Sequence, residues 1–369
     1  MVKLFTTDYD DVERPSSKKG VVMDNMFDAI VKAAGNDYAS KVSDGLESDV
    51  SSYVDTGSYA LNALLSGEIY KGAPSNKIGV FAGEEATGKT FYLLAVAKKF
   101  LDENPTGAVA YFESEQALTK EILEQRGFDT KRIYILPVLT IQEFRTQAVK
   151  ILDEYLAVDE GEREPLLMIL DSAGNLSTTK EVTDIAEGKD TRDMTRAQLN
   201  RGTFRVLALK LGRANVSLLM SNHVYDVIGA YFPTKELSGG GGIKYAASYI
   251  LMLTKSKKKD TDNVVTGAII KIKTVKSRLT RENMVVETLL DYGKGLDRYY
   301  GLLPIAEALG IAQKQGNKYV IGGQTAFENA INKNPEKFFT KVVLDSINEG
   351  CPKLFCYGSD NNALLEEDK

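Results

Sequence analysis

The segment 83–90 carries glycines, a lysine and a hydroxyl at the spacing that binds the phosphates of a nucleotide. It reads GEEATGKT, a complete G-x-x-x-x-G-K-T motif between a predicted strand and a predicted helix. Glycines let backbone N–H groups point at phosphate oxygens, and the helix N-terminus adds partial positive charge. We expect Lys89 to reach the β and γ phosphates and Thr90 to help hold Mg²⁺; the alternative is a chance glycine turn. The predicted nucleotide-binding residues are Gly83, Glu84, Glu85, Ala86, Thr87, Gly88, Lys89, Thr90 and Phe91.

Carboxylates follow two of the predicted buried strands. Asp171 ends the apolar run LLMILD, where a carboxylate can order Mg²⁺ and its waters, so Thr90 and Asp171 are the predicted metal ligands. Glu115 comes just after the strand AVAYFES, where it can orient or deprotonate an attacking water. Glu113 lies two residues earlier and would face the same side if the strand continued. The spacing therefore leaves either glutamate open as the base, and an exposed loop acid remains a third interpretation.

His223 is the single histidine of the chain and directly follows a predicted strand at 215–222. Open α/β sheets bind ligands at the carboxyl ends of their strands, which favours contact with a nucleotide. A lone histidine is more often an ordinary surface or core residue, and no second metal ligand lies nearby in the sequence. An aromatic and glycine-rich segment follows it, and a long polar segment covers 174–201. Long segments of this kind are commonly functional or disordered.

The composition is that of an ordinary globular protein, with 369 residues, of which 43% are hydrophobic and 26% charged. No run of about 18 or more apolar residues occurs, which argues against a membrane span. The first residues lack the apolar stretch of a secretory signal. Cys351 and Cys356 make neither a disulfide framework nor a good zinc site. We therefore expect a reduced, cytoplasmic protein.

The net charge of −5, from 46 basic and 51 acidic residues, argues weakly against nucleic acid as a partner. The charges are unevenly distributed, however. Acidic residues crowd the two ends, while the basic runs KSKKK and KIKTVKSR lie between residues 255 and 278. An acidic protein with a local basic surface remains a possible DNA-binding protein.

The elements that must position these residues alternate between strand and helix. Apolar runs predict strands at 77–82, 108–114, 133–138, 166–171 and 215–222, and helical spacing predicts helices at 89–101, 119–125, 141–155 and 194–212. This alternation predicts an α/β fold with a mostly parallel sheet covered by helices on both faces. Runs at 249–254, 267–276 and 284–290 follow one another without helices and predict an antiparallel extension, with KSKKKDTDN as a polar hairpin.

Two smaller regions flank this core. Residues 1–24 are polar and we expect them to be flexible. Apolar residues recur at helical spacing from Asn25 to about Ser43, which predicts an amphipathic helix packed either on its own core or on a neighbouring subunit. From about Gly301 a small unit follows, with helices around LLPIAEALG and PEKFFTKVVLDSINEG and an acidic tail. We divide the chain into 1–50, 51–300 and 301–369.

These motifs, in this order, resemble those of the RecA-type recombinases, most closely the tailed-phage UvsX branch, over roughly residues 50–310. DTGSYALNALLSGEIYKG resembles the family's lead-in to the P-loop, and YFESEQALT resembles the strand end with the catalytic glutamate, at Glu115. MILDSAGNL matches the Walker B strand at Asp171 and the start of the first DNA-binding loop. SNHVYDV matches the switch that senses the γ-phosphate, at His223, where bacterial RecA has glutamine. LSGGGGIKYAAS matches the far end of the second DNA-binding loop.

The resemblance also implies residue roles. KTVKSR resembles the paired basic residues that reach the neighbouring subunit's ATP, at Lys276 and Arg278; the alternative is a solvated strand edge. Phosphate contact needs positive charge and base stacking needs aromatic faces, which Tyr225, Tyr231 and Phe232 could supply. The implied catalytic residues are Glu115, Lys89, Lys276, Arg278 and His223. The implied DNA-binding residues are Arg192, Arg196, Arg201, Tyr225, Gly239, Gly240, Gly241 and Gly242.

The function implied is that of a DNA-dependent ATPase that uses ATP and Mg²⁺, polymerises on single-stranded DNA and exchanges strands with homologous duplex DNA. Its partners would be DNA, further copies in a helical filament, and single-strand-binding and loading proteins, with no membrane. It would work in the cytoplasm, that of the host for a phage protein. The C-terminal unit departs from the family pattern, which puts a duplex-DNA role there in doubt. Alternatives are a hexameric helicase with the same core and a nucleotide-switched regulator without a DNA role.

Overall fold

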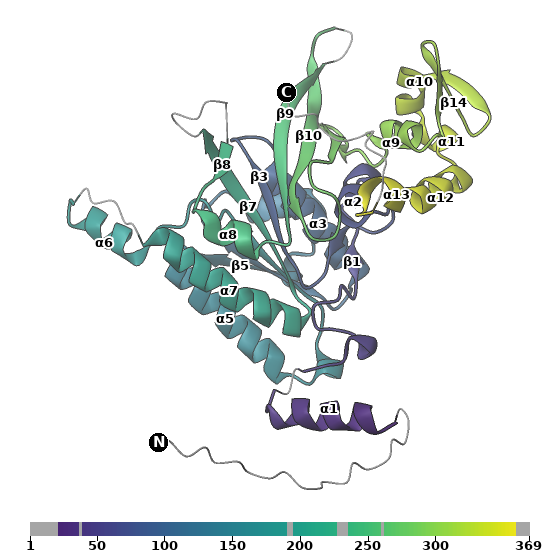
Figure 1. Ribbon diagram of the computed structural model, residues 1–369. Helices are drawn as coiled ribbons and strands as arrows, with labels where there is room; N and C mark the ends of the chain where they lie inside the picture. The colour runs from purple at the N-terminus through teal and green to yellow at the C-terminus, as the bar shows by residue number, and fades with distance from the viewer. Residues whose placement is uncertain (1–20, 37–38, 190–194, 227–234, 260–261, 359–369) are drawn as a thin grey trace, which may run out of the picture. The chain divides into compact units, whose positions relative to one another are not determined.

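The computed structural model describes residues 21–36, 39–189, 195–226, 235–259 and 262–358, and the chain divides into two compact units, 1–49 and 50–369 (Figure 1). The first unit contains helix α1 (Val21–Ala33) and a 3-10 turn (Val42–Asp44). The helix expected at 25–43 therefore starts earlier and ends ten residues sooner. Gly35 has φ 64° two residues after its end, the left-handed geometry that commonly stops a helix. Of residues 1–24, which we expected to be flexible, 1–20 lie outside the described residues, and 21–24 belong to α1, so the expectation is wrong for them.

The second unit is built on a sheet whose central strands run parallel. The strand order is β12-β11-β10-β9-β3-β7-β6-β4-β5, with β8 paired to β7. Pairing is parallel from β9 to β5 and antiparallel at β9–β10, β10–β11 and β11–β12, as predicted. The strands are β3 (Ile78–Gly83), β4 (Ala108–Glu113), β5 (Ile133–Pro137), β6 (Leu166–Asp171), β7 (Ser217–Asp226), β8 (Lys235–Leu237), β9 (Tyr249–Lys259), β10 (Val265–Ser277), β11 (Val285–Asp291) and β12 (Gly295–Leu296).

Helices cover both faces of this sheet, because successive strand side chains point to opposite sides. Phe81 of β3 packs with one buried cluster and its neighbours Val80 and Ala82 pack with the other. Helices α2 and α3 belong to the first cluster; α5, α7 and α8 belong to the second, and α5 and α7 lie side by side (Figure 1). The helices and short strands are β1 (Tyr53–Val54), α2 (Tyr59–Ser66), β2 (Ala73–Pro74), α3 (Lys89–Glu103), α4 (Lys120–Gln125), α5 (Ile141–Ala157), α6 (Thr179–Ala186), α7 (Arg196–Ala214) and α8 (Gly241–Ala246).

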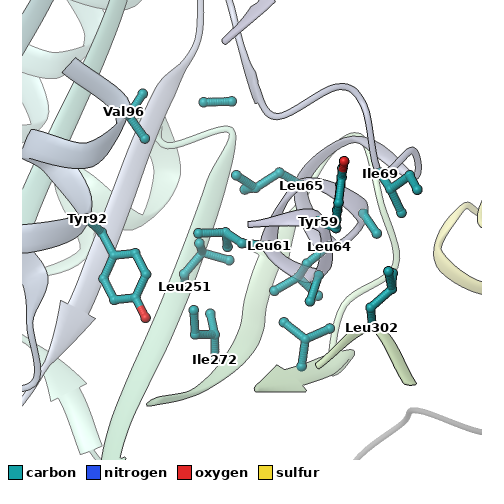
Figure 2. Close-up of a cluster of buried hydrophobic side chains, with 14 of the residues drawn as sticks. Tyr59, Leu61, Leu64, Leu65, Ile69, Tyr92, Val96, Leu251, Ile272 and Leu302 are labelled. Atoms are coloured by element: carbon teal, nitrogen blue, oxygen red, sulfur yellow. The ribbon is translucent and has the colours of Figure 1, made fainter. Parts of the chain in front are cut away.

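Helix α2, in the segment before the P-loop, shares a buried cluster with α3 and the sheet. Its N-cap is Ser58, whose hydroxyl accepts a hydrogen bond from the Leu61 amide. Figure 2 shows its leucines pointing toward Tyr92 of α3, Ile272 of β10 and Leu302, all of them fully buried. Each such side chain contributes about 1.5–3 kcal/mol by leaving water. The segment before the P-loop and the helix after it thus share one core.

The ribbon formed by β9 and β10 is longer than the sequence predicts. The lysine-rich run expected to form a polar hairpin continues β9 as far as Lys259, and Figure 1 shows the two strands extending beyond the rest of the sheet. Lys255 and Lys257 face Ile270 and Ala268 across the ladder. Backbone pairing with an apolar strand therefore overrides the low strand propensity of lysine.

Residues after β12 share the core of α2 and α3. Leu302, Ile347 and Phe355 are buried in the same cluster, so the packing alone marks no boundary at 301, and the domain division stays a prediction. A three-stranded sheet here was not predicted, because its strands are short and largely polar. The elements are α9 (Leu302–Ala308), β13 (Gln313–Gln315), β14 (Lys318–Ile321), β15 (Gln324–Phe327), α10 (Glu328–Lys333), α11 (Pro335–Phe338), α12 (Lys341–Gly350) and α13 (Pro352–Phe355). In the described part of the chain, no helix has the length and apolar character needed to cross a membrane.

Candidate functional site

The P-loop connects the end of β3 to the start of α3, as the motif predicts. Gly88 caps α3 in the left-handed region, with φ 90° and ψ 15°. A Cβ on Gly83 would lie 2.7 Å from the Thr87 hydroxyl and 2.8 Å from the Leu253 carbonyl oxygen. That hydroxyl donates a hydrogen bond of 2.9 Å to the Glu84 carbonyl, which closes the loop. Both glycines are therefore required by the backbone itself.

Lys89 lies folded back onto the loop. Its side chain is buried, and Nζ donates hydrogen bonds to the carbonyl oxygens of Gly83 (3.1 Å) and Glu84 (2.8 Å). Burial lowers the pKa of Lys89, and the negative charges of Glu115 and Asp171 partly oppose this effect. The ammonium thus sits in the field of the two carboxylates that the sequence singled out, and its present partners are neutral carbonyls.

Asp171 ends β6 with both carboxylate oxygens held. Tyr111 of β4 donates to Oδ2 at 2.7 Å and Ser221 of β7 donates to Oδ1. Burial, followed by the charge of Asp171, raises the pKa of Tyr111 well above its ordinary value, so this donor keeps its proton. Thr90 lies in the first turn of α3, directly after the P-loop lysine, and is half-buried. One carboxylate and one hydroxyl are oxygen ligands of the kind that Mg²⁺ takes together with phosphates, so the residues fit this ion.

The structure distinguishes the two candidate glutamates. Glu113 is 6% exposed, and its Oε1 accepts the backbone N–H of Ala117 at 2.7 Å, so it holds the turn after β4. Glu115 lies beyond the strand end with 33% of its side chain exposed. Its Oε1 accepts a hydrogen bond from Asn175 Nδ2 (2.9 Å) and lies 3.3 Å from His223 Nε2. Of the two glutamates, only Glu115 is both open to water and in contact with Asn175 and His223.

His223 lies beside the end of β3, because β7 pairs with β3 in a register that sets Gly83 opposite His223. Its carbonyl accepts a hydrogen bond of 2.9 Å from the Ser238 amide, which joins it to the far end of the second loop. The strand register therefore places His223 next to the start of the P-loop, and its contact with a nucleotide stays a prediction. The histidine also touches the glutamate named as the base.

The second loop is a hairpin whose stem is β7 and β8, with Tyr225 paired opposite Glu236. The exposed Tyr225 hydroxyl donates to the Glu236 carboxylate at 3.3 Å. The tip, residues 227–234, lies outside the described residues, and with it Tyr231 and Phe232. DNA contact by Tyr225 stays a prediction.

The predicted DNA-binding glycines pack against α7. Asn200 Nδ2 donates to the Gly239 carbonyl at 2.7 Å, and a Cβ on Gly242 would lie 2.6 Å from the Arg201 backbone nitrogen. Gly240 and Gly241 lie between them, at the start of α8. These glycines thus allow the close approach of two helices, a role that the sequence analysis did not foresee. Their contact with DNA stays a prediction.

The predicted DNA-binding arginines differ in their surroundings. Arg192 lies outside the described residues. Arg196 Nη2 donates a hydrogen bond of 2.6 Å to the Gly174 carbonyl, which ties the start of α7 to the start of the first loop. Arg201 is exposed, with its guanidinium 6.0 Å from the centre of the Tyr245 ring. Arg201 can therefore meet a phosphate as it stands, whereas Arg196 would first have to leave its carbonyl.

Lys276 and Arg278 hold the C-terminal end of α8 within their own chain. Lys276 Nζ donates to the carbonyl oxygens of Lys244 (2.7 Å), Tyr245 (3.2 Å) and Ala247 (2.7 Å). Arg278 Nη2 donates to the Tyr245 carbonyl at 3.1 Å. Burial, followed by the positive charge of Arg278, lowers the pKa of Lys276. The pair caps a helix end that otherwise leaves carbonyls unsatisfied; a neighbour's nucleotide as their partner stays a prediction.

A cavity of about 790 Å³ lies beside the first turns of α3, and Phe91 is the one predicted nucleotide-binding residue in its walls. Arg126 lies over the Phe91 ring at 5.0 Å, and the exposed Tyr292 comes from the turn between β11 and β12. Aromatic and cationic walls next to a phosphate-binding loop suit a flat nucleotide base. The glycine-bearing turn DYGKGLD was the available sequence signal. The residues that line the cavity include Phe91, Leu94, Lys98, Arg126, Tyr292 and Gly293.

Three features define the class of this protein. They are a parallel sheet with a P-loop after β3, a hydrogen-bonded aspartate at the end of β6, and loops that follow the neighbouring strand ends. Together they define a P-loop protein with a RecA-like core. Residues 21–297 match the family model described as the RecA N-terminal domain, which spans most of the chain. The chain therefore belongs to the RecA family.

Relatives in this family come from a phage and from bacteria. The chain is similar to the recombination and repair protein of Enterobacteria phage T4, 29% identical over 257 residues, which cover 70% of this chain and 64% of the phage protein. It is similar to Protein RecA of Paracoccus denitrificans, 26% identical over 373 residues and 98% of each chain. Protein RecA of Bifidobacterium longum is 23% identical over 359 residues, covering 97% of this chain and 81% of the relative. The match to the phage protein thus leaves about a third of that relative unaligned.

Proposed function

We propose that this chain is a DNA-dependent ATPase that polymerises on single-stranded DNA and catalyses homologous pairing and strand exchange. The observation that carries this proposal is the surroundings of Glu115. One of its oxygens is contacted by Asn175, at the root of the first predicted DNA loop, and by His223, at the root of the second. A base held by both loops gives DNA a direct route to ATP hydrolysis. The phage relative bears the name recombination and repair protein, which agrees with this function.

Nucleotide binding would use the P-loop and the held aspartate. Backbone N–H groups of the loop would cradle the phosphates, and Lys89 would exchange its two carbonyl partners for phosphate oxygens. Thr90 and Asp171 would hold Mg²⁺, which supplies charge neutralisation at the β and γ phosphates. The cavity lined by Phe91 and Tyr292 would take the adenine.

Hydrolysis would take place between two subunits. Glu115 would orient or deprotonate the attacking water. Lys276 and Arg278 of the adjacent copy would stabilise negative charge as the γ-phosphate leaves. His223 would couple the state of the γ-phosphate to the second loop through its contact with Ser238. Nucleotide would thus stiffen the filament, and hydrolysis would loosen DNA.

Two kinds of exposed surface support the proposal of a filament on DNA. Helix α1 carries a half-exposed apolar set, and the edge strand β5 exposes Tyr134 and Ile135 beside its unpaired side; both suit docking on another copy. Arg201 and the lysines of β9 give positive charge for DNA phosphates. The apolar residues of α1 concerned are Met26, Phe27, Ile30 and Val31.

The test is ATP hydrolysis with and without single-stranded DNA across a range of protein concentration. We expect strong stimulation that rises cooperatively with protein, because each active site needs two subunits. Lys89→Ala should abolish turnover. Glu115→Gln should bind ATP, fail to hydrolyse it and stay on DNA, whereas Glu113→Gln should retain turnover in whatever fraction folds. Turnover indifferent to DNA would contradict the recombinase, and processive unwinding without strand exchange would indicate a helicase.

A further inference from the structure

We infer that Asn175 is a positioning residue that restrains Glu115 in the DNA-free protein, and that this restraint is released from the first loop. The inference rests on the proposed function, in which Glu115 is the base. Asn175 follows β6 by four residues, and Nδ2 donates a 2.9 Å hydrogen bond to Glu115 Oε1. His223 reaches the same oxygen at 3.3 Å from the other loop. Two loops therefore hold one carboxylate oxygen, and the amide makes the shorter contact.

Glu115 needs such a partner because no strand ladder fixes it. Strand β4 ends at Glu113, and Gln116 has φ 52°, so Glu115 lies in a turn. The turn is mounted on the root of the first loop: Ser114 Oγ donates to the Ser172 carbonyl (3.1 Å) and accepts the Ser172 amide (2.8 Å). The backbones that carry Glu115 and Asn175 are thus joined by these hydrogen bonds, and the Asn175 amide sets the direction of the Glu115 carboxylate.

The roots of the two loops also touch directly. A Cβ on Gly174 would lie 2.9 Å from Asn222 Oδ1 and 3.1 Å from His223 Cδ2, so the absence of a side chain lets the first root pack on the second. A displacement of Gly174 would therefore move His223 as well as the adjacent Asn175.

The release can start at Arg196. Its guanidinium donates a 2.6 Å hydrogen bond to the Gly174 carbonyl, while its buried Nε has no partner among the described residues. A DNA phosphate offers this guanidinium a charged acceptor, which binds more strongly than a neutral carbonyl. Turning Arg196 toward the phosphate would free Gly174, and Asn175 would then leave Glu115. A carboxylate with its oxygen released can accept a proton from water.

The experiment measures ATP hydrolysis of the full chain without DNA and at saturating single-stranded DNA. In Asn175→Ala we expect the DNA-free kcat to rise by about fivefold or more, the effect of losing one hydrogen bond to a charged group. The DNA-saturated kcat should stay within about twofold and the KM for ATP should hardly change, because DNA removes the same contact. Asn175→Leu, which is close to asparagine in size but has no amide donor, should behave like the alanine variant. Asn175→Gln keeps an amide and should return the DNA-free rate toward that of the unmodified chain.

Thr179→Ala is the matched control, because Thr179 is an exposed residue four positions further along, at the start of α6. It should leave both rates unchanged. In a Glu115→Gln background, Asn175→Ala should give no rise, which shows that the gain runs through the carboxylate. An alanine variant that lowers both rates together, or that keeps the original stimulation by DNA, would overturn the inference. Failure of the proposed function looks different: the unmodified chain would ignore DNA, or Glu115→Gln would still hydrolyse ATP.

Discussion

The ammonium of Lys235 pairs with the carboxylate of Glu84, so the strand that closes the second loop is tied to the P-loop. Lys235 begins β8, and Glu84 is the first residue after β3. Asp226 lies 3.6 Å from the same ammonium and faces Lys235 across the β7–β8 ladder. All three side chains are exposed, so salt should screen the connection. A bound nucleotide changes the charge around Glu84. It would therefore influence the second loop through Lys235, independently of His223.

Removing the Glu84 carboxylate should loosen β8 in the nucleotide-free protein. In Glu84→Gln we expect the β8 amides to exchange with deuterium about two- to threefold faster at low salt, because exposed ion pairs contribute little. The difference should disappear at high salt. Asp102→Asn breaks another exposed pair, with Lys98 on α3, and should leave β8 unchanged. Equal exchange in the Glu84 variant and the unmodified chain at low salt would mean that the pair restrains nothing.

Two glycines near one another in the fold should respond oppositely to alanine. A Cβ on Gly242 would meet the backbone of Arg201 at 2.6 Å, so Gly242→Ala should lower the free energy of unfolding by about 1–3 kcal/mol. Gly202 lies in the interior of α7 with open space around its Cβ, and Gly202→Ala should raise it by about 0.5–1 kcal/mol. Urea midpoints at constant slope measure both. Equal effects would show that α8 does not depend on this close approach.

The buried Cys351 gives a pH-dependent probe of the C-terminal region. Burial raises the pKa of its thiol from 9.0 to about 12, with smaller effects from Cys356 and Glu68. Between pH 9 and 12 the unfolded chain loses this proton while the folded chain keeps it. The folded state then binds more protons, so the free energy of unfolding falls as pH rises, by up to about 1.4 kcal/mol per pH unit.

The measurement for Cys351 is a difference between two denaturation series. Other groups titrate in this range, so Cys351→Ala should lose stability less steeply with pH than the unmodified chain, whatever its stability at neutral pH. The half-buried Cys356 should react with an alkylating reagent before Cys351 does. Identical slopes for the two chains would contradict the buried thiol.

The sheet could be predicted because buried parallel strands are continuous apolar runs. The run LLMILD coincides with the strand found, Leu166–Asp171. The other predicted strands of the sheet begin within about two residues of the strands found. Prediction failed where pairing with a partner decided the structure. Lys255 and Lys257 read as a turn but extend β9, because β10 lies beside them. The helix expected to run to Ser43 ends at Ala33, since Gly35 permits a left-handed turn that apolar spacing does not reveal.

Within the site, sequence spacing identified most of the candidate residues. Their hydrogen-bond partners became known only from the structure. Spacing alone could not choose between Glu113 and Glu115, and only the family resemblance pointed to Glu115. The choice depends on where β4 ends and on which carboxylate accepts the Ala117 amide. Asn175 carried no signal at all, since its partner is 60 residues away. The glycines at 239–242 suggested flexibility, whereas their geometry serves the packing of α8 on α7.

Lys276 and Arg278 are the residues whose predicted role most needs a second copy of the chain. Lys276→Ala with Arg278→Ala should leave the ATP affinity of separate chains within about twofold, because both side chains donate to carbonyl oxygens at the end of α8 and not to the P-loop. DNA-stimulated hydrolysis should be lost, since the neighbour's nucleotide would lack both charges. Faster deuterium exchange in α8 should accompany the change, because its end carbonyls lose their donors. Lys353→Ala, which removes one exposed charge elsewhere, should change none of these.

A mixing experiment separates the role across the interface from the role in α8. Lys89→Ala chains keep Lys276 and Arg278, and the double variant keeps its P-loop, so neither alone hydrolyses ATP. Where a P-loop of the double variant faces a Lys89→Ala neighbour, one complete site forms, at about one site in four in a random equal mixture. We expect the mixture to regain DNA-stimulated hydrolysis to roughly that fraction of the unmodified rate. A mixture that stays inactive, while both variants enter filaments, would confine the two cations to holding α8 and remove them from the neighbour's active site.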